Sequence, residues 1–274
     1  MIPAAFDYER ATSVDHAIDL LTGDDEAKIL AGGHSLLPLM RLRLAQPSKL
    51  VDITRIADLS YVREDGDAIA IGALTRHHDV AANPVLEANC PIVAHTAADI
   101  GDPAVRHVGT IGGSVAHADP ASDLPTVLLA LDATMVVRGA GGGTRQVAAR
   151  DFFKGLFEPD LAANEVLTEI RVPRHTGGWS YIKFHRRAQD WALVGVAALA
   201  ANGSRAAVAL TNMGDRPLRA SAVEHALSGG ADPATAAHHA AEGTSPPSDA
   251  FGSAEYRKEL SKVLVRRALE EAMR

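Results

Sequence analysis

The sequence predicts an α+β protein built from two parts. Helix-like and strand-like segments follow one another in mixed order along the first part of the chain. The composition changes at His175-Thr176-Gly177-Gly178, and beyond it a hairpin signal, Asn202-Gly203-Ser204, lies between two strand-like segments. Mixed order with hairpins favours an α+β arrangement over a doubly wound parallel sheet. At roughly 100–200 residues per domain, the 274 residues suggest two domains, divided near residue 177.

The individual elements are expected from the spacing of apolar residues. A helix should run over Val14–Leu21, because apolar residues recur there at helical spacing after Ser13, a capping residue. Short apolar runs predict the other strands of the first part, Lys28–Ala31, Leu50–Ile53, Ile69–Ile71, Ala133–Arg138 and Val166–Val172. Longer runs predict the helices Leu36–Leu44, Pro84–Ile100 and Leu124–Leu131. A further short helix should begin after Thr75, which would cap it. The second part should contain three strands, Tyr181–His185, Leu193–Ala201 and Arg205–Thr211. Three helices should follow them, Ala220–Leu227, Pro233–Ala241 and Ser253–Met273.

Charge and hydropathy exclude several classes of protein. The 27 Lys and Arg against 34 Asp and Glu give a net charge of −7. This argues against a nucleic-acid partner, because phosphate binding needs a concentrated positive surface. The apolar stretches fall short of the roughly 18–20 residues of a membrane span. The start, MIPAAFDYER, lacks the basic and apolar regions of a signal peptide, so we expect a cytoplasmic protein without a membrane span.

The chain contains one cysteine, Cys90. A single cysteine excludes a disulfide framework, a Cys-rich zinc site and a four-Cys iron–sulfur cluster within this chain. A redox function would therefore need a bound organic cofactor or an electron carrier on another chain. Cys90 itself is expected to be a small core residue within a helix.

Common nucleotide, metal and hydrolase motifs are absent from the sequence. It contains no P-loop, no G-x-G-x-x-G after a strand, no H-E-x-x-H, no C-x-x-C and no G-x-S-x-G. The pairs His77-His78 and His238-His239 do not have the spacing of metal ligands on a helix face. We therefore expect no metal site in this chain.

The first glycine-rich loop, Ala31-Gly32-Gly33-His34-Ser35, lies between a predicted strand and a predicted helix. Paired glycines allow successive backbone N–H groups to point into one concavity that holds phosphate oxygens. Ser35 could add a hydroxyl donor, and the following helix N-terminus favours an anion. The alternative is an ordinary strand-to-helix turn.

The second glycine-rich loop, Val108-Gly109-Thr110-Ile111-Gly112-Gly113-Ser114, contains hydroxyls as well as glycines. His117, Asp119 and Asp123 follow it closely. A carboxylate such as that of Asp123 can accept hydrogen bonds from ribose or ribityl hydroxyls. Alternatively, Asp123 caps the helix that begins at Leu124. Two phosphate-type loops could hold the diphosphate of a dinucleotide from both sides.

The two loops and the segment after them resemble the FAD-binding medium subunit of the molybdenum hydroxylases, the family of xanthine dehydrogenase and carbon monoxide dehydrogenase. That last segment is Ala118-Asp119-Pro120-Ala121-Ser122-Asp123-Leu124-Pro125. The likeness extends from about Phe6 to the last helix. It implies a two-subdomain flavin-binding fold of the PCMH or vanillyl-alcohol-oxidase type over residues 1–176, with subdomains of about 1–55 and 56–176. It also implies a C-terminal CO-dehydrogenase-flavoprotein-like domain over 177–274, a small antiparallel sheet with helices.

Carried over residue by residue, the resemblance implies an FAD site and no catalytic acid or base. Ile29–Leu36 would wrap the diphosphate, Leu167 would pack on the adenine side, and Lys183 would lie close to the cofactor or be a solvated strand residue. Trp191 would cover the isoalloxazine ring or fill a domain interface. The full set of implied cofactor-binding residues is Ile29, Leu30, Ala31, Gly32, Gly33, His34, Ser35, Leu36, His77, Ile100, Thr110, Gly112, Gly113, Ser114, His117, Asp119, Asp123, Leu167, Lys183 and Trp191.

The resemblance also implies a place in a larger complex. A large molybdopterin subunit would oxidise the substrate, a small subunit would hold two [2Fe–2S] clusters, and this chain would pass electrons through FAD to an external acceptor. The three subunits would form a heterotrimer that dimerises. Two other functions stay open at this point. One is a free-standing FAD-dependent oxidoreductase with its own small-molecule substrate, and the other is a non-redox binding module that has lost FAD.

Overall fold

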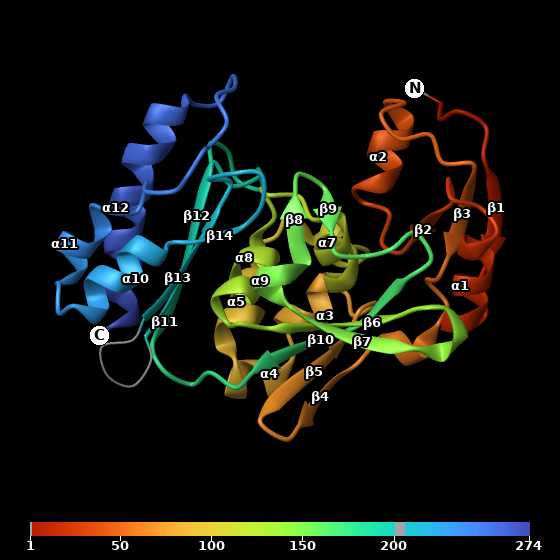
Figure 1. Ribbon diagram of the computed structural model, residues 1–274, viewed down its shortest axis with the longest axis horizontal. Coiled ribbons are helices and arrows are strands. Elements are labelled where there is room, and N and C mark those ends of the chain that lie inside the picture. The colour runs from red at the N-terminus through yellow and green to blue at the C-terminus, as the bar shows by residue number, and fades with distance from the viewer. Residues whose placement is uncertain (1, 201–205) are drawn as a thin grey trace.

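The computed structural model describes residues 2–200 and 206–274 and contains three main sheets that follow one another across the molecule (Figure 1). The first sheet is parallel, in the order β1 (Asp7–Arg10), β3 (Lys49–Asp52) and β2 (Lys28–Leu30). Its helices are α1 (Val14–Thr22) and α2 (Leu36–Arg41). The Ser13 hydroxyl caps α1 by accepting the N–H of His16, as the sequence predicts.

The second sheet is antiparallel and stands at the centre of the molecule. Its order is β4 (Val62–Asp65), β5 (Ala68–Gly72), β10 (Val166–Pro173), β6 (Thr134–Arg138) and β7 (Thr144–Ala148). The short helices around it are α3 (His77–Ala81), α4 (Pro84–Asn89), α5 (Pro91–Ala98), α6 (Pro103–Arg106), α7 (Ile111–His117), α8 (Asp123–Ala130) and α9 (Ala149–Phe152). Two 3₁₀ turns, Ala57–Leu59 and Ala140–Gly142, and a small hairpin, β8 (Phe153–Gly155) with β9 (Glu158–Pro159), complete this part.

The third sheet is also antiparallel and lies between two layers of helices. Its order is β11 (Trp179–Phe184), β12 (Val194–Ala200), β13 (Ala206–Thr211) and β14 (Leu218–Arg219). Three helices cover its outer face, α10 (Ser221–Ser228), α11 (Pro233–Ala237) and α12 (Ala254–Ala272). The other face packs on α5 and α8 of the central part. Among the described residues, no helix is both long and apolar enough to cross a membrane.

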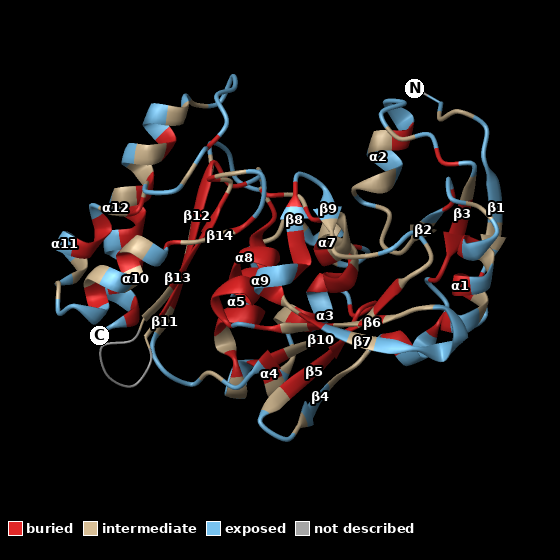
Figure 2. Ribbon diagram, in the orientation of Figure 1, coloured by how far each residue is buried: buried red, intermediate tan, exposed pale blue. Residues whose placement is uncertain are grey.

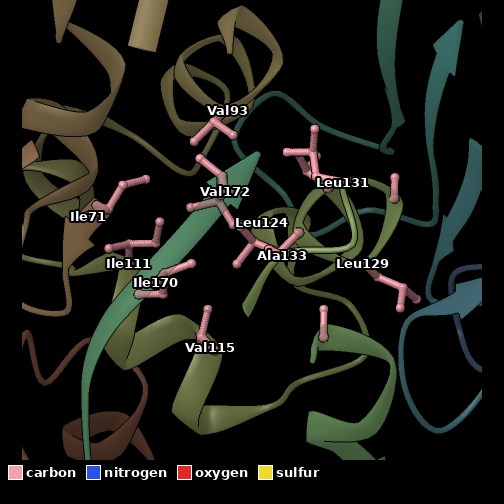
Figure 3. Packing of buried hydrophobic residues seen from close by; sticks show 14 of the residues in the cluster. Ile71, Val93, Ile111, Val115, Leu124, Leu129, Leu131, Ala133, Ile170 and Val172 are labelled. Carbon is pink, nitrogen blue, oxygen red and sulfur yellow. The ribbon is translucent and has the colours of Figure 1, made fainter. Parts of the chain in front are cut away.

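The largest apolar core lies between the second and third sheets. Figure 2 shows buried residues concentrated on β5, β10 and β12 and on helices α5 and α8. Figure 3 shows Ile170 and Val172 of β10 packed near Ile111 and Leu124 of the helices. The same cluster includes Ala197 and Leu199 of β12 together with neighbours from β13. The α+β fold that the sequence predicts is confirmed, and its two parts share one core.

Two predicted helices are wrong in detail. The predicted helix over Pro84–Ile100 is two helices, α4 and α5, because Pro91 cannot continue a helix and keeps the preceding residue out of helical geometry. Cys90 occupies the break, with φ −157° and ψ 63°, and is fully buried in the core. Thr75 does not cap α3. Its hydroxyl donates to the Tyr61 carbonyl and accepts the Tyr61 N–H instead.

The remaining differences fall at element ends and at exposed strands. Helix α2 ends at Arg41, before the apolar run to Leu44 is complete. Strands β1, β4 and β7 do not follow from the apolar pattern, because each is an edge strand with mostly solvated side chains. The turn Asn202-Gly203-Ser204 lies outside the described residues, but the strands that it joins pair as predicted.

Candidate functional site

A cleft of about 670 Å³ opens between the first sheet with α2 on one side and α7, the β8–β9 hairpin and the third sheet on the other. This volume lies within the range of ligand and cofactor sites. Every residue that the family resemblance implies for the cofactor lines this cleft except Leu30 and Asp119. The Leu30 side chain instead packs beside Gly33, and the Asp119 carboxylate accepts the N–H of Ala121 at 2.9 Å. These two residues shape the loops from behind.

The first glycine loop presents backbone donors to the cleft. In the described part of the chain, no acceptor pairs with the N–H groups of residues 32–35, which follow β2 and precede α2. Gly33 has φ +71°, a left-handed conformation that favours glycine. None of these four residues is buried, so their N–H groups are open to water or to a ligand. This row of donors fits the oxygens of a diphosphate.

The two glycine loops are in direct contact. A Cβ on Gly32 would lie 2.6 Å from the Val108 carbonyl oxygen and 2.7 Å from the Gly109 Cα. Both neighbours are backbone atoms, so a side chain at this position would force the loops apart. Gly32 is therefore required for the close approach of two segments that lie far apart in the sequence.

The second glycine loop does not form a second nest of free N–H groups. Most of its donors are already used, because Ile111 N–H donates to the Thr75 carbonyl and Gly112 N–H to the Ala73 carbonyl. The Thr110 hydroxyl accepts the Gly113 N–H at 3.1 Å and so caps α7. The glycines serve close packing, since a Cβ on Gly112 would lie 2.5 Å from that of Ala73. What this loop offers to a ligand is hydroxyl groups.

A buried histidine lies behind the second loop. His77 is 5 % exposed, and its Nδ1 has no hydrogen-bond partner among the described residues. Burial lowers the pKa of His77 to about 4, with smaller contributions from His34 and Arg106. The ring is therefore neutral at neutral pH and adds no charge to the cleft. Its unpartnered Nδ1 is itself buried behind the lining of the cleft.

A buried ion pair forms the floor of the cleft near the third sheet. Lys183 Nζ donates to Asp123 Oδ2 at 2.9 Å and to the Asp99 carbonyl at 3.2 Å. The Tyr181 hydroxyl donates to Asp123 Oδ1 at 2.6 Å. The two charged side chains are 3 % and 6 % exposed. Burial raises the pKa of Asp123, and the Lys183 ammonium opposes this shift.

This arrangement decides two alternatives that the sequence leaves open. Lys183 is not a solvated strand residue, because its side chain is buried against α5 and α8. Asp123 is not a helix cap, since Ser122 occupies the cap position of α8 and both carboxylate oxygens accept side-chain donors. Each oxygen has a second lone pair, so the carboxylate can still accept a ligand hydroxyl.

Trp191 lies at the open end of the cleft. Its side chain is 60 % exposed, so it does not fill an interface between the two parts of this chain. Gln189 and Asp190, in the same loop, also line the cleft. His117 of α7, another lining residue, has its ring centroid 5.0 Å from that of Phe157, and burial lowers the pKa of this histidine.

The cleft lining also contains residues that the sequence reasoning missed. Residues 161–163 and Glu165 line one wall together with Leu167, which was predicted. The Arg145 guanidinium of β7 holds this segment, since it donates to both carboxylate oxygens of Glu165 and to the side chain and carbonyl of Asp160. No local motif marks this wall, because it depends on pairs 15 and 20 residues apart. Gly101, Val105 and Gly109 are further lining residues, and only the glycines gave a sequence signal.

The lining suits a ligand that carries phosphate, hydroxyl and apolar ring groups. The lining combines the free N–H donors of residues 32–35 with the hydroxyl residues Thr110 and Ser114, with apolar side chains such as Leu167 and with an exposed indole. The one carboxylate on the floor is neutralised by its lysine. These are the features that the FAD site implied by the sequence requires.

Comparisons with known proteins agree with this geometry. Residues 4–175 match the family model described as the FAD binding domain in molybdopterin dehydrogenase, and residues 179–272 match the CO dehydrogenase flavoprotein C-terminal domain. The chain is 41% identical to the glyceraldehyde dehydrogenase medium chain of Sulfolobus acidocaldarius, with 99% of each chain covered. It is 39% identical to the alpha subunit of the 6-hydroxypseudooxynicotine dehydrogenase complex of Paenarthrobacter nicotinovorans, over 100% of this chain and 96% of that one.

A solved structure shows the same fold. The carbon monoxide dehydrogenase structure from Hydrogenophaga pseudoflava superimposes with a TM-score of 0.95 at 43% identity, covering 100% of this chain and 99% of that chain. Two family models together span nearly the whole sequence, and the relatives are similar over their full length. The chain therefore belongs to the family of FAD-binding medium subunits of the molybdenum hydroxylases.

Proposed function

We propose that this chain binds one FAD in the cleft and acts as the electron-transfer subunit of a heteromeric molybdenum hydroxylase. The observation that carries the proposal is the row of free N–H donors at residues 32–35, held against the second glycine loop in a cleft of about 670 Å³. FAD supplies the chemistry, since it can accept single electrons and deliver a pair to an external acceptor.

The residues of the chain bind and orient the cofactor. The N–H groups of Gly32 to Ser35 would hold one side of the diphosphate, and the hydroxyls of Thr110 and Ser114 the other. Asp123, fixed by Lys183 and Tyr181, would accept a sugar or ribityl hydroxyl. The segment around Leu167 would contact the adenine end, and Trp191 would cover the flavin ring. Electron transfer needs no acid or base from the protein, so none is assigned.

The partners we propose are a large subunit with the molybdenum–pterin centre and a small subunit with [2Fe–2S] clusters, in a dimer of heterotrimers in the cytoplasm. The names of the relatives support this, since they include medium chains and a subunit of a dehydrogenase complex. Electrons would enter from another chain, because one buried cysteine cannot hold a cluster here. The large subunit would choose the substrate.

Reconstitution with FAD tests the cofactor part of the proposal. The purified full chain should show flavin absorbance, or take up FAD stoichiometrically after reconstitution. No flavin absorbance and no uptake would refute the proposal. Co-purification of the chain with the two other subunits tests the partner part of the proposal. Turnover of a small substrate by the isolated flavoprotein would instead favour a free-standing oxidoreductase.

A further inference from the structure

The loop that carries Trp191 joins β11 to β12 and spans residues 185–193. The Leu193 N–H donates to the Phe184 carbonyl at 2.7 Å and closes the base of this loop. Gln189, the first of its cleft-lining residues, has φ +72°. The loop makes little regular structure of its own, so the position of Trp191 depends on the groups that hold the backbone next to it.

Two side chains hold the two carbonyls that directly follow Trp191. Asn212, at the end of β13, donates from Nδ2 to the Ala192 carbonyl at 2.8 Å. Arg257, in α12, donates from Nη1 to the Leu193 carbonyl at 2.5 Å. Two donors from separate elements therefore fix consecutive peptide groups beside the indole.

Arg257 is a charged residue at a buried position, where desolvation of the guanidinium is unfavourable. It is 1 % exposed, and Nη2 pairs with Asp249 Oδ2 at 2.7 Å, while Nε has no partner among the described residues. A buried charged group is weak support for stability, and an apolar side chain of similar volume often packs as well or better. The rest of the buried face of α12 is apolar apart from Ser261. What an apolar residue could not supply is the hydrogen bond to Leu193.

The backbone of Asn212 is also held in an unusual conformation. Its φ of +60° is in the left-handed region, where asparagine is among the favoured non-glycine residues. Its own N–H donates at 2.8 Å to the Pro120 carbonyl, in the turn that leads to Asp123. Asn212 thus connects the loop of Trp191 to the turn that precedes Asp123.

We propose that Arg257 and Asn212 are positioning residues that hold Trp191 over the flavin ring. The inference rests on the proposed function, since it needs FAD in the cleft. Neither residue touches the cofactor site, because neither lines the cleft. They act through the peptide groups of Ala192 and Leu193, which fix where the indole stands.

Fluorescence titration of the full apo-chain with FAD tests this inference, because a stacked indole quenches flavin emission. Aromatic stacking energies predict that Trp191→Ala weakens FAD binding by about three- to ten-fold, and bound flavin should become brighter. Asn212→Gly removes the amide donor but tolerates the positive φ, and it should change both readouts in the same direction. Arg257→Met should do the same. Arg266→Met, a half-exposed arginine of the same helix, should match the wild type.

Combined variants separate positioning from a general loss of stability. In the Trp191→Ala background, Asn212→Gly should cause little further change in FAD affinity, because the group it positions is gone. Fully additive effects of Trp191→Ala and Asn212→Gly on FAD affinity would overturn the inference. Wild-type flavin brightness and FAD affinity in Asn212→Gly alone would also overturn it. If Arg257→Met fails to fold, Asn212→Gly decides the matter. Wild-type FAD uptake with no response to Trp191→Ala would overturn it and leave the proposed function standing. Absence of FAD uptake by the wild type would overturn the proposed function itself.

Discussion

Replacing Lys183 with Met tests the buried ion pair on the floor of the cleft. The two side chains are 3 % and 6 % exposed and 2.9 Å apart. Without the ammonium, the Asp123 carboxylate stays buried with the Tyr181 hydroxyl as its side-chain donor. Breaking a buried pair in this way costs about 3–5 kcal/mol. We therefore expect a loss of this size in the free energy of unfolding, measured by urea denaturation of the apo-chain.

The loss should depend on pH in a defined direction. Burial raises the pKa of Asp123, and losing the ammonium raises it further. An acid whose pKa is higher in the folded state holds its proton more tightly there, so stability falls as pH rises through the folded pKa. The deficit of Lys183→Met relative to the wild type should therefore be smaller near about pH 5 than near about pH 8. Adding Asp123→Asn should recover part of the loss, because it removes the buried charge.

An exposed pair provides the matched control. Lys262 and Glu259 are 2.6 Å apart, but their side chains are 32% and 72% exposed. Lys262→Met should therefore change the free energy of unfolding by less than about 1 kcal/mol at either pH. A deficit in Lys183→Met that is no larger than that of Lys262→Met, and equal at both pH values, would refute the reasoning.

Three further predictions address the walls of the cleft. Gly32→Ala should introduce about 1–3 kcal/mol of overpacking strain and weaken FAD binding in a titration. Gly23→Ala should be neutral, because Gly23 has open space around it. Equal behaviour of the two variants would contradict the contact between the loops. His77 has its pKa lowered to about 4 from 6.5, so the unfolded chain binds its proton first as pH falls, and the wild type should lose about 2 kcal/mol between pH 7 and pH 5. His77→Gln should lack this part of the loss in denaturation curves, and an unchanged pH dependence would count against a buried neutral ring. A lysine at position 145 cannot keep both hydrogen bonds that Arg145 donates to Glu165. In Arg145→Lys, FAD affinity should therefore fall by up to about tenfold, while the free energy of unfolding changes by about 1 kcal/mol. Unaltered affinity would show that this wall does not contact the ligand.

Apolar periodicity was sufficient for elements that bury one face. Helix α1 and strands β10 and β12 lie close to their predicted ranges, because each packs apolar residues at a regular spacing. Edge strands such as β7 have solvated side chains and carry no such pattern. Breaks depend on single residues, as Pro91 shows, and a periodic run of apolar residues can continue across them.

The candidate site was predictable where the chain forms it locally. Both glycine loops are contiguous segments with a characteristic order, and their residues line the cleft. The supporting pairs were not predictable, because their partners are distant in the sequence. Lys183 meets Asp123 across 60 residues, and Arg257 meets Leu193 across 64. No local pattern records which of many charged residues will be paired inside the fold.

The sequence by itself determined the family, the cofactor class and the two segments that form the centre of the cleft. It did so through a resemblance, because the order and spacing of both glycine loops and of the segment Ala118–Pro125 match those of the family. Only the tertiary structure decided what each loop does there. The first keeps its N–H groups free at residues 32–35, whereas the second gives those of Ile111, Gly112 and Gly113 to the backbone of Thr75 and Ala73 and to its capping hydroxyl. The difference arises from the partners that folding brings beside each loop, since a backbone donor is available to a ligand only where the fold leaves it unpaired.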